Sequence, residues 1–199
     1  MTPIIRIATV QDAADMVAIY APIVRHTAIS FELEPPTVQV MQQRVADTLR
    51  RLPWLIYEGH GKVLGYAYAS THRARAAYQW SVDVSVYIDA DSRRSGAGRA
   101  LYTALFRLLA RQGFYNAYAG ITLPNTASVS LHETLAFEAI GVYHNVGYKL
   151  GAWHNVGWWQ LRLQTDEQAP AAPLPFAAIK QDTAAWQAAL SAGQALLRG

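Results

Sequence analysis

The segment from Arg93 to Gly98 has the residue types and the spacing of an anion-binding loop. It lies between a predicted strand, Ser81 to Ile88, and a predicted helix, Arg99 to Gln112. Two glycines, Gly96 and Gly98, allow the backbone to turn tightly with its amide hydrogens pointing inward, and the start of the helix adds further unpaired N–H groups. Three arginines stand alongside. The segment therefore predicts a site for a ligand that carries phosphate.

Two common nucleotide-binding motifs do not describe this anion-binding loop. The dinucleotide fingerprint requires a third glycine and the P-loop requires Gly-Lys followed by Ser or Thr, and the sequence has neither here. The alternative is a plain glycine turn that enters a helix, with its arginines in solvent. Cations at a helix N-terminus oppose the helix dipole, and a bound anion would explain why they are there.

The composition indicates one well-buried domain. Of 199 residues, 52% are hydrophobic and 16% are charged, which is enough apolar material for a core and too little charge for disorder. The absence of cysteine excludes disulfides, thiolate metal sites and a cysteine nucleophile, and six scattered histidines predict no metal site. A formal charge of +3 without a long basic run gives little support for nucleic-acid binding. No apolar run of membrane-spanning length and no targeting pattern is visible, so we expect a cytoplasmic protein without a membrane partner.

The elements that must position the anion-binding loop alternate between strands and helices. Hydrophobic periodicity, turn residues and capping residues predict their types and ends. Thr9 is the predicted cap of the first helix, Pro22 its predicted end, and Thr37 the predicted cap of the second helix. The predicted elements are a strand at 3–8, helices at 9–22 and 37–49, strands at 54–58, 62–70 and 81–88, a helix at 99–112, a strand at 117–123, a short helix at 125–134, and two long strands around Val142 and Trp158. This order indicates an α/β (α+β) domain with antiparallel parts.

The C-terminal part of the chain differs in composition from the rest. Residues 166–175 are rich in Ala and Pro and are predicted to form a linker. Trp186, Leu190 and Leu197 give the last segment a weak helical amphipathicity, which favours docking on the body of the protein or on a partner over disorder. We therefore divide the chain into a domain at 1–165 and a linker with a C-terminal helix at 166–199.

Several motifs together resemble a known family. The order of strand, Arg93-x-x-Gly96-x-Gly98 and helix resembles the acetyl-CoA pyrophosphate motif of the GNAT acyltransferase superfamily, and Leu131 to Phe137 resembles its later helix signature. Within that superfamily, residues 4–164 resemble the phosphinothricin and methionine sulfoximine N-acetyltransferase subgroup. The motifs that carry this resemblance are Ser30-Phe31-Glu32, Pro53-Trp54-Leu55, Gly65 to Ala69, Ala74 to Trp80, Ser85-Val86-Tyr87, Leu123-Pro124-Asn125, Leu131-His132-Glu133 and Trp153 to Gly157.

The resemblance implies a fold, a reaction and an assembly. The fold would be a GNAT fold, with a mixed, mostly antiparallel central sheet that is splayed between strands 4 and 5 and carries helices on both faces. The reaction would be transfer of an acetyl group from acetyl-CoA, in a direct ternary complex, to the α-amine of a small glutamate-like amino acid that carries a phosphinate or sulfoximine group. A homodimer is expected. Two other functions stay open, namely acetylation of a different amine, such as a polyamine or a protein N-terminus, and a non-catalytic sensor that binds acyl-CoA.

Two residues are the catalytic candidates. An ammonium group cannot attack a thioester, so a base must remove its proton, and Asp83 occupies the position where the subgroup usually has Glu. Since the aspartate side chain is one methylene shorter, we expect Asp83 to act through a bridging water, or to contribute less to the rate than the positioning of the substrates does. The alternative is that its carboxylate only orients the neighbouring arginines. His132 lies where many members have the Tyr that protonates the departing thiolate. Imidazole could be that acid or the base, and a surface histidine paired with a carboxylate is the other interpretation.

The resemblance also assigns binding residues. Asn125 could hydrogen-bond the pantetheine amide or simply cap its helix, and the two arginines of the acceptor set could bind anionic groups or be solvated. Phe31 could line the acceptor's stem or belong to the core. The predicted coenzyme residues are Val86, Tyr87, Ile88, Arg93, Arg94, Ser95, Gly96, Ala97, Gly98, Arg99, Ala100, Asn125 and Ser128. The predicted acceptor residues are Phe31, Arg73, Arg75, Tyr78 and Tyr87.

Overall fold

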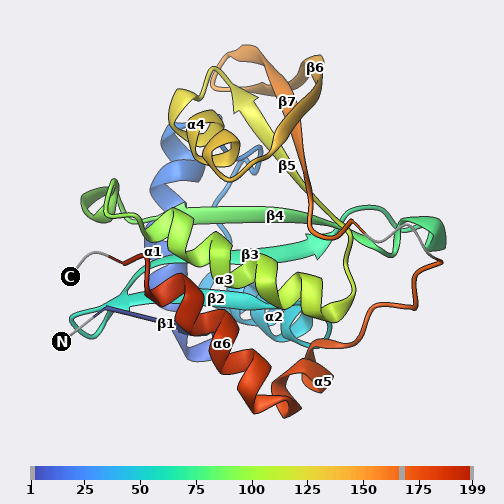
Figure 1. Cartoon of the computed structure of the whole chain (residues 1–199). Helices are drawn as coiled ribbons and strands as arrows, with labels where there is room; N and C mark the ends of the chain where they lie inside the picture. The colour runs from blue at the N-terminus through green and yellow to red at the C-terminus, as the bar shows by residue number, and fades with distance from the viewer. Residues whose placement is uncertain (1–2, 166–168, 198–199) are drawn as a thin grey trace.

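A seven-stranded sheet forms the centre of the computed structural model, which describes residues 3–165 and 169–197 (Figure 1). The strands follow the order β1-β2-β3-β4-β5-β7-β6, and each neighbouring pair is antiparallel except β4 and β5. The sheet is therefore mixed and mostly antiparallel, as predicted. The strands are β1 Ile4–Ile7, β2 Trp54–Gly59, β3 Lys62–Thr71, β4 Ser81–Ile88, β5 Asn116–Leu123, β6 Glu138–Lys149 and β7 Ala152–Arg162.

Helices cover both faces of this sheet. In Figure 1, α3 and α6 lie in front of the sheet and α1 and α2 lie behind it. Each layer encloses a hydrophobic core, one between the sheet and α3, α5 and α6, the other between the sheet and α1 and α2. None of the helices in the described parts of the chain combines the length and the hydropathy needed to cross a bilayer. The helices are α1 Ala13–His26, α2 Val38–Leu49, α3 Ala97–Gln112, α4 Thr126–Thr134, α5 Phe176–Gln181 and α6 Thr183–Gln194, with 3-10 turns at Val10–Asp12, Ala76–Tyr78 and Ala90–Ser92.

The parallel pair in the middle of the sheet separates along its length. Strands β4 and β5 are paired only where residues 81–83 face residues 116–118. Beyond that point β4 keeps its partner β3, and β5 keeps its partner β7, but the two strands no longer pair with each other. The predicted splay between the fourth and fifth strands is confirmed. Backbone groups on the facing edges of β4 and β5 are thereby left without a ladder partner.

The structure corrects the predicted ends of the first helix. Pro22 does not end it, because α1 continues to His26. A proline inside a helix costs about 3 kcal/mol, whereas fully burying an aliphatic side chain contributes roughly 1.5–3 kcal/mol, and Ile23 and Val24 are both buried after Pro22. Packing on the sheet therefore outweighs the lost helix bond. The predicted cap at Thr9 precedes the 3-10 turn and not α1 itself.

Other predicted helix ends are close to those observed. Thr37 caps α2, since its hydroxyl accepts a hydrogen bond from the backbone N–H of Val40 at 3.2 Å. Helix α3 begins at Ala97, two residues before the predicted Arg99, and Gly113 follows it in the left-handed conformation that a helix C-terminus favours. The anion-binding loop is therefore shorter than predicted, because its last residues already belong to the helix.

The C-terminal helices pack on the body of the protein. Helix α6 lies along α3 and touches β1, and a Cβ at Gly193 would collide with the backbone carbonyl of Ala100. The segment before α5 is attached as well, because the Trp80 indole N–H donates to the carbonyl of Ala171 at 2.8 Å. The predicted linker at 166–175 falls partly on residues 166–168, which lie outside the described residues.

Candidate active site

A cleft opens where β4 and β5 diverge. One wall comes from β4, the other from β5, and α4 with the side of α3 closes one end. On β4, Val82 and Val84 are buried towards α3, so the alternating residues Asp83, Ser85 and Tyr87 face the layer of α1 and α2. The residues that line the cleft are Ile29, Val84, Ser85, Val86, Tyr87, Tyr102, Ala119, Gly120, Ile121, Thr122, Asn125, Ser128 and His132.

The anion-binding loop joins β4 to the N-terminus of α3 beside this cleft. Gly96 is the cap residue of α3 and has a φ of 85°, a left-handed conformation that glycine adopts without strain. A Cβ at this position would lie 3.3 Å from the carbonyl oxygen of Leu196. The Ser95 hydroxyl donates to the carbonyl of Ser92 at 2.7 Å, which holds the turn closed. Backbone N–H groups in the first turn of α3 have no acceptor within the helix and can face an anion.

The predicted coenzyme residues in and just after the anion-binding loop differ in their exposure. Arg93, Arg94 and Arg99 are exposed around the anion-binding loop, whereas Ala97 and Ala100 are buried against the core below it. Exposed guanidinium groups beside the unpaired N–H groups of a helix N-terminus suit the diphosphate of a coenzyme. The two alanines contribute backbone and close packing, not side-chain contacts to a ligand.

Val86, Tyr87 and Ile88 form the end of β4 at the wider part of the cleft. They pair with β3 on one side only, so alternate backbone groups point into the opening towards β5. The ring of Tyr87 packs on the opposite layer, with its centroid 4.9 Å from that of Tyr20 and 5.3 Å from that of Tyr66. Burial there raises the pKa of Tyr87 well above its usual value. Its phenol therefore stays neutral.

Asp83 lies where the pairing of β4 with β5 stops, directly before Val84 of the cleft wall, and is not itself among the residues that line the cleft. Its carboxylate oxygen Oδ1 is 2.6 Å from Nδ1 of His72, a residue that directly follows β3. Burial raises the pKa of Asp83, while the hydrogen bond from His72 and the charges of His72 and Arg73 oppose that rise. His72 was not among the predicted site residues. One feature of the sequence could have identified His72. It directly precedes Arg73, in the loop whose residues are predicted to bind the acceptor.

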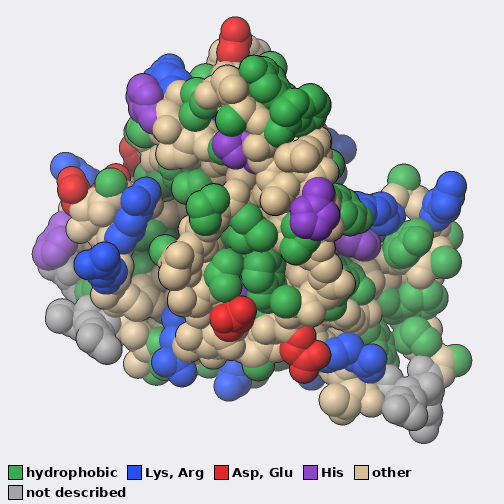
Figure 2. All heavy atoms as spheres, turned by 90° about the horizontal axis from the view of Figure 1, so that it is seen from above, with side chains coloured by type: hydrophobic (Ala, Val, Ile, Leu, Met, Phe, Trp, Pro, Cys, Tyr) green, Lys and Arg blue, Asp and Glu red, His purple; other side chains and the backbone are tan. Residues whose placement is uncertain are grey.

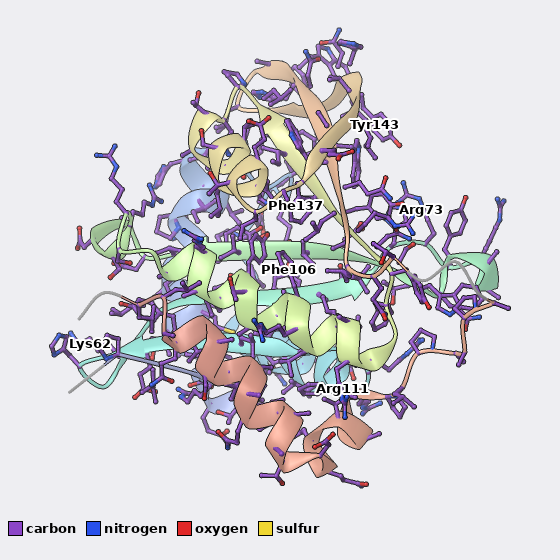
Figure 3. The ribbon with its side chains drawn as sticks, in the orientation of Figure 1. Lys62, Arg73, Phe106, Arg111, Phe137 and Tyr143 are labelled. Carbon is purple, nitrogen blue, oxygen red and sulfur yellow. The ribbon has the colours of Figure 1, made fainter. Side chains whose placement is uncertain are left out.

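Aromatic rings surround this carboxylate and imidazole pair. The ring of His72 stacks on Tyr118 at 4.3 Å between centroids, and the guanidinium carbon of Arg73 lies 5.9 Å above the ring of Trp158. Figure 3 shows Arg73 below Tyr143 at the right of the view, and the ring of Tyr143 also contacts Trp158. These side chains form a surface that combines the positive charge of Arg73 with the flat apolar faces of aromatic rings.

The other predicted acceptor residues lie in two different places. Arg75 and Tyr78 are exposed in the loop between β3 and β4, beside His72. Phe31 does not line the cleft. Its ring lies over Gly147 of β6, and its place in the cleft is taken by Ile29 from the same loop. Sequence reasoning missed Ile29, because no local pattern distinguishes it from Phe31.

His132, on α4, is buried against α3 at the end of the cleft that these two helices close. Its Nδ1 lies 2.7 Å from the backbone carbonyl of Ser128, so Nδ1 carries the hydrogen and donates it. Its Nε2 is 3.2 Å from the hydroxyl of Tyr102, which the sequence did not point to. Burial lowers the pKa of His132, and the hydrogen bond to the Ser128 carbonyl partly offsets this. The imidazole is therefore neutral at pH 7 and accepts a proton at Nε2.

Asn125 caps α4, since its side-chain oxygen accepts the backbone N–H of Ser128 at 3.1 Å. That was one of its two predicted roles. The same cap places Ser128 one turn before His132, where its carbonyl orients the imidazole. Asn125 and Ser128 both line the cleft, so the cap also shapes the wall opposite β4.

Comparisons with known proteins agree with this arrangement. The profile of the family described as acetyltransferase (GNAT) domain matches residues 5–158. The chain is 41% identical over 173 residues to a phosphinothricin N-acetyltransferase of Streptomyces viridochromogenes, covering 85% of this chain and 92% of the relative. It is 34% identical over 173 residues to an L-methionine sulfoximine/L-methionine sulfone acetyltransferase of Pseudomonas aeruginosa, covering 85% of this chain and 100% of the relative.

Solved structures show the same fold. A phosphinothricin acetyltransferase of Sinorhizobium meliloti in complex with acetyl-CoA superposes with a TM-score of 0.81 at 30% identity, covering 86% of this chain and 94% of that chain. An acetyltransferase of Salmonella typhimurium, solved with acetyl-CoA, also has a TM-score of 0.81, at 31% identity, and covers 86% of this chain and 99% of that chain.

A splayed mixed sheet with an anion-binding loop at the opening defines an acyltransferase that uses a coenzyme A thioester. The chain belongs to the GNAT acetyltransferase family. It is an acetyl-CoA-dependent N-acetyltransferase, with acetyl-CoA as cosubstrate.

Proposed function

We propose that this enzyme acetylates the α-amine of a small glutamate-like amino acid, such as phosphinothricin, methionine sulfoximine or methionine sulfone. The observation that carries the proposal is the group of side chains beside the point where β4 and β5 separate, where Arg73 lies above Trp158 and its charge acts on Asp83. A guanidinium group beside a carboxylate can bind an anionic or strongly polar group while the carboxylate faces an amine. The names of the two relatives support the same class of acceptor.

Within this proposal, Asp83 and His132 act in turn on the same nitrogen. Asp83 accepts the proton of the ammonium group, and alternate N–H groups at the end of β4, residues 86–88, face the oxygen that becomes negative when the nitrogen attacks. Neutral His132, next to Tyr102, takes a proton from the nitrogen of the adduct and passes it to the departing sulfur. The coenzyme's diphosphate binds at the anion-binding loop, and Asn125 and Ser128 border its pantetheine arm.

A panel of acceptors tests the substrate class. Purified protein and acetyl-CoA are mixed with methionine sulfoximine, methionine sulfone, phosphinothricin, common amino acids and polyamines, and the release of free thiol is followed. The glutamate-like sulfur and phosphorus compounds are expected to have the highest kcat/KM. A preference for polyamines would contradict the proposal, since those acceptors carry no anionic group for Arg73. Coenzyme binding without thiol release for any amine would identify a non-catalytic sensor.

Arg73→Gln is expected to raise the KM for the best acceptor by about 10-fold or more, because a hydrogen bond to a charged group contributes roughly 1.5–3 kcal/mol. The KM for acetyl-CoA should stay unchanged, since Arg73 lies at the far end of the cleft from the anion-binding loop. Steady-state kinetics with each substrate varied in turn measures both. Arg50→Gln is the matched control, because the Arg50 side chain is 76% exposed on the surface. Equal effects of the two variants would rule out an acceptor role for Arg73.

We further propose that the protein is a homodimer that uses the hairpin of β6 and β7. Strand β6 is the edge of the sheet and is exposed along almost its whole length, and long apolar edges tend to pair with another chain. Figure 2 shows hydrophobic side chains gathered on the face where this hairpin lies uppermost. Its exposed large hydrophobic side chains are Ile140, Val142, Tyr143, Val146, Tyr148, Leu150 and Trp153.

Val142→Lys is expected to shift the protein from dimer to monomer, because it places a charge in the centre of this edge. Light scattering coupled to size-exclusion chromatography measures the mass. Val38→Lys on α2 is the matched control, since Val38 is 41% exposed and Val142 is 42% exposed. A dimer that persists with Val142→Lys, or a wild-type monomer, would refute the proposed interface.

A further inference from the structure

We propose that His72 is a positioning residue for the transfer reaction: its imidazole holds one carboxylate oxygen of Asp83 so that the other oxygen faces the acceptor amine. This inference rests on the proposed function, because it concerns the base that prepares the amine for attack. It adds a residue to the site and gives a physical reason why aspartate serves where the subgroup usually has glutamate.

The backbone of Asp83 is fixed by the sheet, but its carboxylate needs a further contact to fix its orientation. Asp83 sits on β4 between two paired neighbours, Ser70 of β3 and Tyr118 of β5, so its backbone is fixed on both sides. Its short side chain can still rotate, because the terminal torsion of aspartate is broad. The contact of 2.6 Å between Oδ1 and His72 Nδ1 removes that freedom. Among the residues that the structure describes, no side-chain donor contacts Oδ2, which leaves this oxygen for an amine or a bridging water.

The direction of the hydrogen bond follows from the chemistry of the two groups. An ionised carboxylate only accepts, so Nδ1 of His72 must carry the hydrogen. The imidazole is itself immobile: it stacks on Tyr118 with an interplanar angle of 18° and meets the rings of Tyr78 and Trp158 edge-on. His72 is thus a fixed donor, clamped by aromatic rings from a neighbouring strand, a loop and β7.

Exposure assigns the roles within the pair. The side chain of His72 is 12% exposed, whereas that of Asp83 is 29% exposed. An acceptor that approaches from solvent therefore reaches the carboxylate more readily than the imidazole. This favours Asp83 as the base and His72 as the group that orients it, over the reverse assignment.

The same contact affects the charge of Asp83. Burial raises the pKa of this carboxyl group, and the hydrogen bond from His72, the charge of His72 and the charge of Arg73 lower it. The titratable groups that face Asp83 are His72 and Arg73 from the end of β3 and the following loop, Tyr68 from β3 itself, and Tyr118 from β5. Removing the donor at His72 should therefore raise the pKa of Asp83. The fraction of enzyme with an ionised base would then fall in mildly acidic solution.

The proton balance of the step is simple. The ammonium group of the acceptor gives one proton to Oδ2 of Asp83, directly or through one water, and the freed lone pair bonds to the thioester carbonyl carbon. The carbon–sulfur bond then breaks, and the departing sulfur takes the second proton lost by the nitrogen. The hydrogen on Nδ1 of His72 stays in place throughout, and Asp83 later releases its proton to solvent.

Two substitutions at the same position separate positioning from packing. His72→Leu removes the donor, and His72→Asn keeps an amide N–H near the position of Nδ1. His72→Leu is expected to lower kcat/KM for the best acceptor by at least about 10-fold at pH 7, within the range of general-base effects, and to move the acid limb of the kcat/KM profile to higher pH. His72→Asn should keep kcat within about threefold of wild type. His26→Leu, at an exposed position at the end of α1, is the matched control and should change nothing.

The opposite results would overturn the inference. An unmoved acid limb in His72→Leu would mean that His72 only packs, and a His72→Asn variant as slow as His72→Leu would mean that the imidazole itself carries the proton. Binding of acetyl-CoA, measured by calorimetry, verifies that each variant is folded.

The test of the role of His72 does not depend on the proposed substrate class. If another amine is the better acceptor, that class fails, and the same variants are compared on that amine. An NMR titration of the 13C-labelled Asp83 carboxyl group in wild type and His72→Leu needs no turnover at all. A higher pKa in the variant supports the inference, and an equal pKa overturns it.

Discussion

Gly96→Trp is expected to lower the affinity for acetyl-CoA by at least about 100-fold, because a loss of several charge-assisted hydrogen bonds, each contributing roughly 1.5–3 kcal/mol, exceeds that factor. The indole would fill the space in front of the first turn of α3, where the diphosphate is proposed to bind. It would also force a side chain onto a residue with a φ of 85° and push against the carbonyl of Leu196. Isothermal titration calorimetry with acetyl-CoA, and with coenzyme A alone, measures the loss.

A second glycine provides the control for backbone strain. Gly61, in the turn between β2 and β3, has a φ of 74°, and a Cβ there would meet nothing within 4 Å. Gly61→Trp therefore imposes a similar left-handed strain far from the cleft. It should lower the Tm by an amount comparable to Gly96→Trp but bind acetyl-CoA normally. If both variants bind the coenzyme as wild type does, the anion-binding loop does not hold the diphosphate, and the proposed arrangement of the whole cleft is wrong.

His132→Ala is expected to lower kcat by about 100-fold or more, the usual effect of losing a general acid or base. Acetyl-CoA affinity should stay within about threefold, because His132 is not part of the anion-binding loop that is proposed to hold the diphosphate. Since burial lowers the pKa of His132 below its usual value and the neutral form is the active one, wild-type kcat should stay constant from neutral pH down past pH 6.5 and fall only in more acidic solution. Stopped-flow measurement of acetyl transfer across this pH range tests both statements.

Stability must be separated from catalysis in this variant. Removing the imidazole leaves the buried hydroxyl of Tyr102 without its partner, which costs roughly 1–3 kcal/mol of unfolding free energy. Urea denaturation measures that cost. His144→Ala, at an exposed position on β6, is the matched control for the substitution itself. A His132→Ala enzyme that is folded and turns over at the wild-type rate would exclude His132 from the reaction.

Local sequence patterns were sufficient for most of the elements. The alternation along 81–88, the apolar stripe of the helix that follows and the cap at Thr37 each depend on residues within a few positions of one another. The resemblance to a family added the splay between strands 4 and 5. Pro22 shows where local reasoning fails, because the burial of Ile23 and Val24 outweighs the helix-breaking tendency of one proline.

In the candidate site, too, some features follow from local sequence and others only from tertiary packing. The anion-binding loop could be predicted because its glycines, its arginines and the start of α3 are contiguous in the chain. The partners of the two catalytic candidates could not, since His72 reaches Asp83 only through the pairing of β3 with β4, and Tyr102 reaches His132 only through the packing of α3 on α4. The packing of Phe106 of α3 against Phe137, labelled in Figure 3, is part of that same contact.

The sequence by itself determined which segments become strands and helices and that a glycine turn leads into α3, because those properties depend on backbone preferences and on neighbours in the chain. Only the tertiary structure decided which side chain orients Asp83, which hydroxyl meets His132, that Ile29 and not Phe31 faces the cleft, and that α6 docks on α3. Such contacts join residues from distant positions, and they form only when burial of the two cores brings the sheet and its helices together.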